Sequence, residues 1–245
     1  MSQDQHQDRL YSDSRKQIDA FAFDDSVAHV FADMIKRSVP GYGLTLSMLG
    51  VLAKQHVTDN SNVYDLGCSL GAGTLSMREN IQGNHVTIVG VDSSAAMLSR
   101  CSDIVEKHHS PIPVKLICAD VRTIAIEKAS MAVMNFTLQF VPEEDRLTLL
   151  SKIFDGLNPG GILVLSEKIA FNDKAEEQLQ IDMHHAFKRA HGYSDLEISQ
   201  KRTALENVLI PEPLDGHHAR LKEAGFSRSH TWFQCFNFSS IIAYK

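Results

Sequence analysis

A short glycine-rich stretch follows an apolar run and has the residue types of a ligand-binding loop. In it, Asp65, Gly67, Ser69 and Gly71 occupy every second position. Small residues at this spacing allow backbone N–H groups to approach a ligand closely, and glycine also adopts the left-handed conformation that such loops use. A loop of this kind between a strand and a helix predicts a nucleotide-like site. A tight turn without a ligand remains the alternative for the loop alone.

Two acidic residues later in the chain narrow the chemistry of this site. Asp92 ends a β-branched run 25 residues after Gly67, where a carboxylate can accept both hydroxyls of a ribose. A nicotinamide-dinucleotide domain would place an acid similarly, but the loop lacks the G-x-G-x-x-G pattern. Asp120 ends the next run, where it can accept from an adenine amino group or cap a turn.

Asn135 ends a further apolar run and is expected to face the sulfonium end of S-adenosyl-L-methionine (SAM). A neutral amide cannot serve as a general base near pH 7, so we assign this residue a positioning role. A turn-forming asparagine is its alternative. Taken with the loop, polar residues at three successive strand ends predict a SAM site.

The elements that must position these residues alternate between strand and helix patterns. Strands are predicted at 62–66, 86–91, 114–119, 130–136 and 162–165, with intervening helices at 73–81, about 97–105 and 142–157. Further helices are predicted at 27–39, 44–56 and 214–224, and a closing antiparallel hairpin at 231–244. This order predicts an α/β fold with a Rossmann-like, doubly wound and mostly parallel sheet, whose strand ends share one edge.

The chain divides into a tail and one domain. Residues 1–20 are polar and predict a flexible N-terminal tail, whereas residues 21–245 predict a single SAM-binding α/β domain. A helical insertion is expected at about 173–210. Leu179, Met183 and Phe187 recur there at helical spacing, which predicts either a core face or a dimer seam.

Composition argues against several other classes of function. The formal net charge of −6 disfavours direct nucleic-acid binding, which needs a basic face. No apolar run approaches the ~20 residues that cross a bilayer, and no signal peptide is evident, so a cytoplasmic protein without membrane contact is expected. The four cysteines form no C-x-x-C pair, and the histidine pairs at 184–185 and 217–218 lack further ligands, so no metal site is expected.

Longer stretches carry a more specific resemblance. The segment 157–165, LNPGGILVL, resembles the post-helix segment of class I SAM-dependent methyltransferases and so implies their fold. Four other segments resemble the carboxy-S-adenosyl-L-methionine synthase family: 37–42 (RSVPGY), 64–71 (YDLGCSLG), 135–140 (NFTLQF) and 192–202 (GYSDLEISQKR). The similarity covers nearly the whole chain after the tail.

The resemblance implies an enzyme that converts SAM and prephenate into carboxy-SAM, phenylpyruvate and water. In that family's chemistry prephenate loses its ring carboxyl as CO2, its departing hydroxide deprotonates the SAM methyl group, and the ylide carbon captures CO2. Segment 135–140 contains no Asp, Glu or His, which agrees with a site that has no dedicated protein base; a base from the insertion is the alternative. The resemblance also implies a homodimer and a functional link to the tRNA carboxymethyltransferase, because carboxy-SAM is the donor for wobble-uridine (cmo5U34) modification.

The same resemblance assigns the site residues. Arg202 is implied as the catalytic residue that reaches the new carboxylate from the neighbouring subunit, since a guanidinium binds carboxylates bidentately. Without the resemblance, the basic residues around Arg202 would indicate only a solvent-exposed charge on the surface of a helix. The implied SAM-binding residues are Tyr42, Gly67, Cys68, Ser69, Asp92, Ser93, Asp120, Val121, Asn135 and Arg202. A conventional small-molecule methyltransferase, or a SAM-binding regulator without chemistry, is the alternative.

Overall fold

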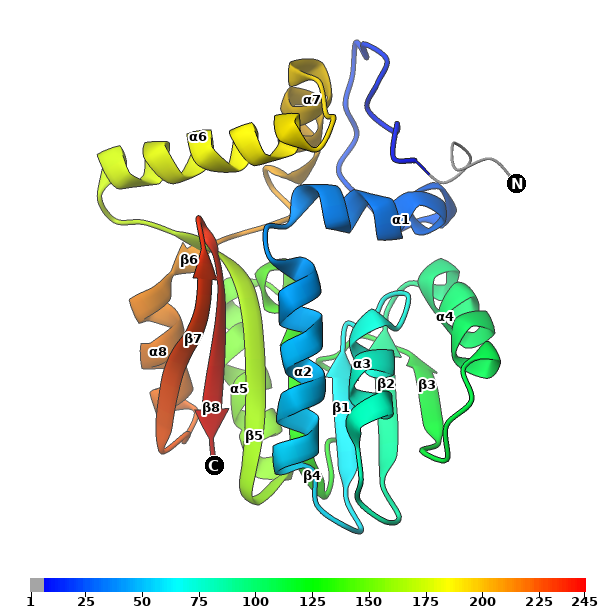
Figure 1. The fold of residues 1–245 in the computed structure, drawn as a ribbon. Coiled ribbons are helices and arrows are strands. Elements are labelled where there is room, and N and C mark those ends of the chain that lie inside the picture. The colour runs from blue at the N-terminus through cyan, green and yellow to red at the C-terminus, as the bar shows by residue number, and fades with distance from the viewer. Residues whose placement is uncertain (1–6) are drawn as a thin grey trace.

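The computed structural model describes residues 7–245, and residues 1–6 lie outside the described part. Its centre is one sheet with the strand order β3-β2-β1-β4-β5-β8-β7 (Figure 1). The strands are β1 (Asn62–Leu66), β2 (Thr87–Asp92), β3 (Val114–Cys118), β4 (Ala129–Asn135), β5 (Leu157–Ala170), β6 (Glu212–Pro213), β7 (Arg228–Cys235) and β8 (Phe238–Tyr244). β1 to β5 pair in parallel, and β8 pairs antiparallel with both β5 and β7. The predicted α/β sheet and closing hairpin are confirmed.

Eight helices and a short 3-10 turn surround this sheet in the described part of the chain. They are α1 (Asp25–Ser38), α2 (Tyr42–His56), α3 (Ala72–Asn80), α4 (Ala95–Lys107), η2 (Leu138–Phe140), α5 (Glu143–Gly156), α6 (Lys174–Ala190), α7 (Asp195–Leu205) and α8 (Leu214–Glu223). Figure 1 shows α1, α6 and α7 above the edge at which β1, β4 and β5 run upward. The predicted helical insertion therefore covers the edge at which the strand-end residues gather.

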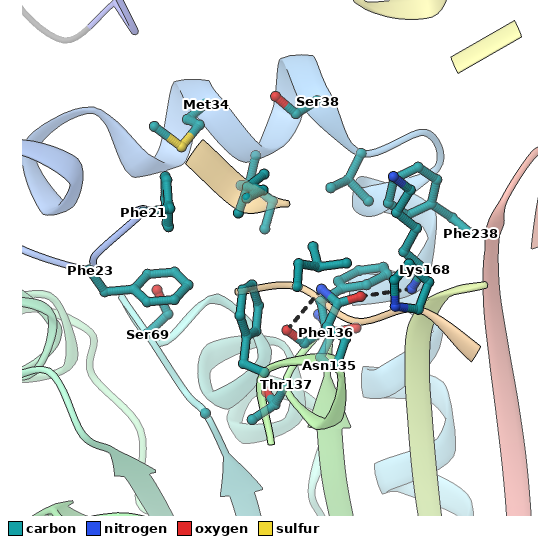
Figure 2. A pocket seen from close by; sticks show the side chains of 18 of the residues that line it. Phe21, Phe23, Met34, Ser38, Ser69, Asn135, Phe136, Thr137, Lys168 and Phe238 are labelled. Carbon is teal, nitrogen blue, oxygen red and sulfur yellow. Dashed lines mark hydrogen bonds between the residues drawn. The ribbon is translucent and has the colours of Figure 1, made fainter. Parts of the chain in front are cut away.

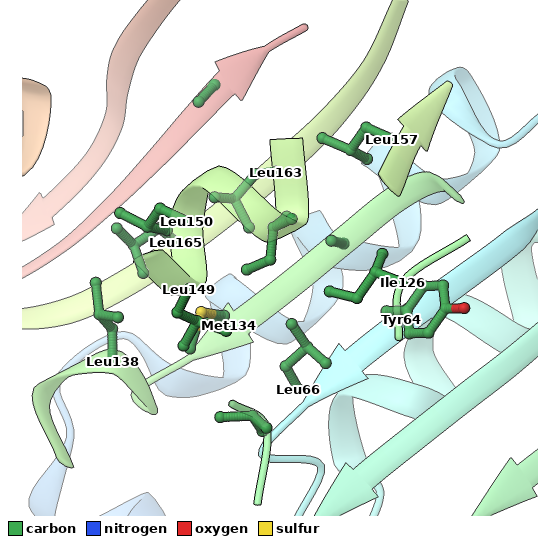
Figure 3. Packing of buried hydrophobic residues seen from close by; sticks show 14 of the residues in the cluster. Tyr64, Leu66, Ile126, Met134, Leu138, Leu149, Leu150, Leu157, Leu163 and Leu165 are labelled. Atoms are coloured by element: carbon green, nitrogen blue, oxygen red, sulfur yellow. The ribbon is translucent and has the colours of Figure 1, made fainter. Parts of the chain in front are cut away.

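Strand β4 shows why both faces of the sheet are apolar. Successive side chains of a strand point to opposite faces. Met131 and Val133 pack with buried residues of α2 and α3, whereas Met134 packs with those of α5 and α8 (Figure 3). Each of these side chains is fully buried, which stabilises the fold by roughly 1.5–3 kcal/mol per side chain. Two packed layers of helix therefore hold the strand ends in place.

Strand β5 is longer than the apolar run 162–165 predicts. Its polar residues Ser166, Glu167 and Lys168 are paired with β8, opposite Ser240, Ser239 and Phe238. Backbone pairing does not require apolar side chains, so the hydrophobic pattern does not reveal this extension. As a result, β5 carries Glu167 and Lys168 up to the edge that holds the strand-end residues.

The segment 7–20 differs from the flexible tail predicted for residues 1–20. Asp8 is 2% exposed and accepts a hydrogen bond from the hydroxyl of Tyr193, 185 residues away. Tyr11 is buried in a cluster with α1, and its carbonyl accepts from Gln200 Nε2 at 2.9 Å. Polar side chains are buried here because they meet polar partners in the insertion. The part of the predicted tail in residues 1–6 lies outside the described residues.

Helix α6 presents part of its apolar stripe to solvent. Leu179 and Met183 are 57% and 42% exposed. The core-face alternative is therefore wrong for these two residues, because a core face would be covered. The dimer-seam alternative stays a prediction.

Candidate active site

A cavity of about 500 Å³ lies between the ends of the parallel strands and the helices α1, α6 and α7. All ten residues that the sequence predicts for SAM binding line this one cavity. They come from the ends of β1, β2, β3 and β4, from α2 and from α7. The tertiary structure thus brings together residues that span positions 42 to 202, and their binding roles remain predictions.

The glycine loop after β1 has little room for larger residues. The amides of Gly67 and Cys68 donate to the carbonyl of Val91 on β2, at 2.7 and 3.0 Å. Gly67 has a φ of +86°, and an added Cβ would lie 2.2 Å from the hydroxyl oxygen of Thr137. Only glycine satisfies both conditions without strain. The turn thereby brings backbone, and not side chains, close to the ligand.

Asp65, on β1 just before this loop, links the strand to the helix that follows the loop. It is 2% exposed, and its Oδ2 accepts a 2.6 Å hydrogen bond from the hydroxyl of Thr74 on α3. Burial raises the pKa of Asp65 to about 6, while the Thr74 hydrogen bonds oppose this shift. The carboxyl therefore ties β1 to the first turn of α3.

Asp92 has the geometry expected of a ribose-binding carboxylate. Its Oδ2 accepts from Ser69 N at 2.9 Å, and its Oδ1 accepts from Ser94 N at 2.8 Å. Burial raises the pKa of Asp92 despite these bonds. A carboxylate has about four lone-pair sites, so one remains on each oxygen for a ligand hydroxyl. The two backbone bonds fix the orientation that binding both hydroxyls requires.

Asp120 is partly engaged by a neighbour that sequence reasoning missed. Arg122 binds it with two donors, Nε to Oδ1 at 3.0 Å and Nη2 to Oδ2 at 2.6 Å, and this pairing lowers the pKa of Asp120. Asp120 also caps its own turn by accepting from Arg122 N at 2.8 Å. Both residues line the cavity. The turn-capping alternative is thus realised, while acceptance from adenine stays a prediction.

Asn135 has a buried side-chain oxygen that indicates a ligand-binding role. Its Oδ1 is buried and has no hydrogen-bond partner among the described residues. A buried acceptor left unpaired costs roughly 1–3 kcal/mol. A ligand that brings positive charge or a donor into the cavity would satisfy it, and the ammonium and sulfonium groups of SAM both fit. The donor and acceptor set of this cavity therefore fits SAM.

The next residue, Phe136, adopts a strained backbone. Its φ is +62°, which bulky L residues rarely adopt and which is typical of functional sites. Its amide donates to the carbonyl of Ser166 at 2.7 Å, and its ring packs between Tyr42 and Phe238. This packing places Tyr42 beside the segment that follows Asn135.

Glu167 holds the rest of this segment and was missed by sequence reasoning. It is 2% exposed and accepts from the amides of Leu138 and Gln139 at 2.9 Å each. Burial raises its pKa to about 8, and the two amide bonds oppose the shift. Glu167 was not selected from the sequence because it lies beyond the predicted end of β5, at residue 165. Glu167 is a positioning residue, because it touches the loop and does not line the cavity.

An aromatic wall closes one end of the cavity. Phe21 and Phe23 meet edge to face at 5.1 Å, and Phe23 meets Phe140 at 5.3 Å. Figure 2 shows Phe21, Phe23 and Met34 on one side and Lys168 and Phe238 on the other. Apolar aromatic surfaces of this kind suit a flat purine ring. The sequence carries no periodic signal for Phe21 and Phe23, which lie before α1.

Basic residues gather at the opposite, roof end of the cavity. Four of them line it, and they are Lys168, Lys188, Lys201 and Arg202. Arg202 stands exposed on α7 at the cavity of its own chain. Its predicted reach into a neighbouring subunit stays a prediction.

Two other kinds of feature are absent from residues 7–245. No group of three or more His, Cys, Asp or Glu is arranged there to hold a metal ion. None of the helices in this range has the length and the apolar character of a membrane span.

His184 in this roof makes stability sensitive to acid. Its Nε2 donates to the carbonyl of Ser38 at 2.8 Å, and burial together with the Lys188 charge lowers its pKa to about 2. Below pH 6.5 the unfolded chain takes up a proton that the native histidine does not, so stability falls as pH drops from 6.5 towards 2. At pH 5 this amounts to about 2 kcal/mol.

The measurement is urea unfolding at pH 7 and pH 5. The native chain is expected to lose about 2 kcal/mol more over this interval than His184→Gln, which does not titrate there. Equal losses in the two proteins would show that His184 does not carry the effect.

Comparison with known proteins identifies the class of protein. Residues 63–161 match the family model described as a methyltransferase domain. A protein of Methanococcus maripaludis assigned as a SAM-dependent methyltransferase superposes with a TM-score of 0.61 at 19% identity, covering 94% of this chain and 97% of that chain. Human N-acetylserotonin methyltransferase, solved with SAM, superposes at 0.60 and 13% identity, covering 90% and 55%. The chain has the class I fold of SAM-dependent transferases.

Closer relatives then define the family. A carboxy-S-adenosyl-L-methionine synthase of Actinobacillus pleuropneumoniae serotype 7 is 56% identical over 98% of this chain and 100% of its own length. Proteins of the same name from Glaesserella parasuis and Geobacter sp. are 58% and 54% identical, over 97% of this chain and 99% and 98% of theirs. The chain belongs to the carboxy-S-adenosyl-L-methionine synthase family, and the resemblance seen in the sequence is confirmed.

Proposed function

We propose that this protein makes carboxy-SAM from SAM and prephenate. Phenylpyruvate and water are the other products. The observation that carries the proposal is one cavity with two parts. The ten predicted SAM-binding residues form the first part, which we call the SAM cradle, and the basic side chains of the roof form the second. Relatives that match nearly the full chain bear the name carboxy-S-adenosyl-L-methionine synthase. A cradle alone would serve methyl transfer to many acceptors, whereas basic groups suit a substrate that carries carboxylates.

The proposed reaction couples aromatisation to carboxylation. The ring carboxyl of prephenate leaves as CO2, and its bond electrons enter the ring while the ring hydroxyl departs. The hydroxide takes a proton from the SAM methyl group, which forms water and leaves a carbanion next to the positive sulfur. That carbon attacks CO2 and forms the new carbon–carbon bond. Prephenate with two negative charges thus becomes phenylpyruvate with one, and the other charge stays on the new carboxylate.

Each part of this cavity has a role in the proposal. Asn135 orients the sulfonium end, and Arg202 binds the new carboxylate. The Gly67 loop and Asp92 hold the methionine and ribose parts. The aromatic wall at Phe21 and Phe23 packs against the purine.

The experiment is a single incubation of the purified protein with SAM and prephenate, followed by mass spectrometry. We expect carboxy-SAM, which is SAM plus one CO2 unit, and phenylpyruvate in equal amounts. Formation of neither product would refute the proposal. Formation of S-adenosylhomocysteine with an added acceptor would instead favour a conventional small-molecule methyltransferase.

The proposal extends to the protein's partners. Carboxy-SAM would supply the tRNA carboxymethyltransferase that modifies the wobble uridine, in the cytoplasm. We also propose a homodimer in which the exposed Leu179 and Met183 of α6 contribute to the seam. Light scattering tests the dimer, and a monomer at working concentration would refute it.

A further inference from the structure

Two lysines in the roof have no anionic partner. Lys168 lies near the end of β5 and Lys188 lies in α6, and both line the cavity. Lys188 is only 8% exposed. Within residues 7–245 neither ammonium group forms a hydrogen bond or an ion pair. Neither ammonium nitrogen is among the fully buried atoms, so both are open to the cavity, where an anionic group of a ligand can pair with them.

The charged groups around Lys188 are mostly positive, which favours the binding of an anion there. Lys188 is faced by Lys201, Lys168 and Asp8, and burial together with the two lysine charges lowers its pKa to about 7. Asp8 is paired with Lys201 instead, at 3.7 Å, and its carboxylate also accepts from the Tyr193 hydroxyl.

Lys168 has a similar environment. It is faced by Glu177, which raises its pKa, and by Arg202, which with burial lowers it, and the net direction is down. Glu177 already accepts from Phe171 N at 2.7 Å. Figure 2 shows Lys168 on the same side of the cavity as Asn135 and Phe238, away from the aromatic wall. Lys168 therefore lies outside the part of the cavity that suits the purine, and Lys188 is close enough for their charges to interact.

We propose that Lys168 and Lys188 form a carboxylate subsite in the cavity roof, which holds the carboxylate that the co-substrate keeps throughout the reaction. This inference rests on the proposed function. Prephenate carries two carboxylates, of which one is lost as CO2 and reappears on SAM, where Arg202 is assigned to it. The other belongs to the pyruvyl group and remains on phenylpyruvate. It needs its own anchor to hold the ring against the methyl group, and the unpaired lysines supply one.

The test is calorimetric titration of prephenate into protein loaded with S-adenosylhomocysteine, which lacks the transferable methyl group and so prevents turnover. Lys168→Met and Lys188→Met are each expected to weaken prephenate binding about ten- to hundredfold, as expected for one lost charge-assisted bond. Their affinity for S-adenosylhomocysteine is expected to stay within about twofold of the native value, which also shows that they are folded. Lys54→Met, which removes an exposed charge on α2, is the matched control and should bind prephenate normally.

Proton linkage gives a second readout. At pH 8 a lysine with a pKa near 7 is mostly neutral, and a bound carboxylate favours its charged form. Prephenate binding to the native protein should therefore take up protons, seen as a dependence of the binding enthalpy on the ionisation enthalpy of the buffer. Lys188→Met should reduce this dependence, and the part that remains is assigned to Lys168, whose pKa is also lowered.

Phenylpyruvate tests the subsite in the native protein, without any substitution. It retains only the carboxylate assigned to the lysines, so it should compete with prephenate in the same complex. Absence of competition would overturn the subsite.

The remaining outcomes separate the two proposals. If the native protein makes carboxy-SAM but the lysine variants bind prephenate normally, the subsite alone is wrong. If the variants lose S-adenosylhomocysteine and prephenate equally, the lysines belong to the SAM cradle and the subsite is again wrong. If the native protein neither binds prephenate nor makes carboxy-SAM, both proposals fail.

Discussion

Gly67→Ala is expected to destabilise the protein by roughly 2–5 kcal/mol and to weaken SAM binding at least about tenfold. A φ of +86° costs an alanine about 1–2 kcal/mol, and the new Cβ would lie within 3 Å of three Thr137 atoms, Oγ1 at 2.2 Å being the nearest. Either the loop or Thr137 must shift, and both line the cavity. A moved loop loses backbone contacts to the ligand. Urea unfolding and calorimetric titration of SAM measure the two effects.

Gly160→Ala separates backbone strain from the clash. Gly160 has a φ of +78°, close to that of Gly67, but nothing lies within 4 Å of its added Cβ. This control is expected to lose about 1–2 kcal/mol of stability and to bind SAM normally. If Gly67→Ala resembles this control in both measurements, the close approach to Thr137 has no part in holding the loop.

Arg202→Ala is expected to act on the product more than on SAM. Carboxy-SAM differs from SAM by one carboxylate, and the loss of a charge-assisted hydrogen bond costs ~1.5–3 kcal/mol. Affinity for carboxy-SAM should therefore fall about ten- to hundredfold, while affinity for SAM stays nearly constant. Product formation from SAM and prephenate should fall as well. Titration of the variant with both ligands, and the mass-spectrometric assay, measure these effects.

Arg189→Ala is the matched control for this substitution. Arg189 is also a basic residue of the insertion, but it pairs with Asp195 at the surface and does not line the cavity. Its loss should leave both affinities unchanged. Equal weakening of SAM and carboxy-SAM by Arg202→Ala would contradict the assigned role of Arg202.

The local elements of this fold follow from the sequence, because their signals are local. Strand β1 is predicted at its observed bounds, and α1 begins after Asp24, which caps it by accepting from Val27 N. Alternating and continuous apolar runs determine which segments are strands, and right-handed parallel crossovers then gather the strand ends on one edge. That argument alone brings Asp92, Asp120 and Asn135 to one cavity.

Contacts between distant segments could not be predicted in this way. Glu167 holds the segment after Asn135 from a neighbouring strand, and its polar surroundings carry no periodic pattern. Asp8 is buried because Tyr193 meets it across 185 residues. Both are polar groups whose burial is tolerated only when a partner is present, and the partner is decided by packing.

The sequence by itself determined the α/β architecture, the strand-end acids, the glycine loop and, through resemblance, the family. The tertiary structure decided that Glu167 holds the segment after Asn135. It also decided which further side chains share the cavity: the aromatic wall of Phe21 and Phe23, and the unpaired lysines of the roof. The physical reason is that periodicity encodes which face of an element is buried. Which residues of two distant elements face one another depends on how the elements pack.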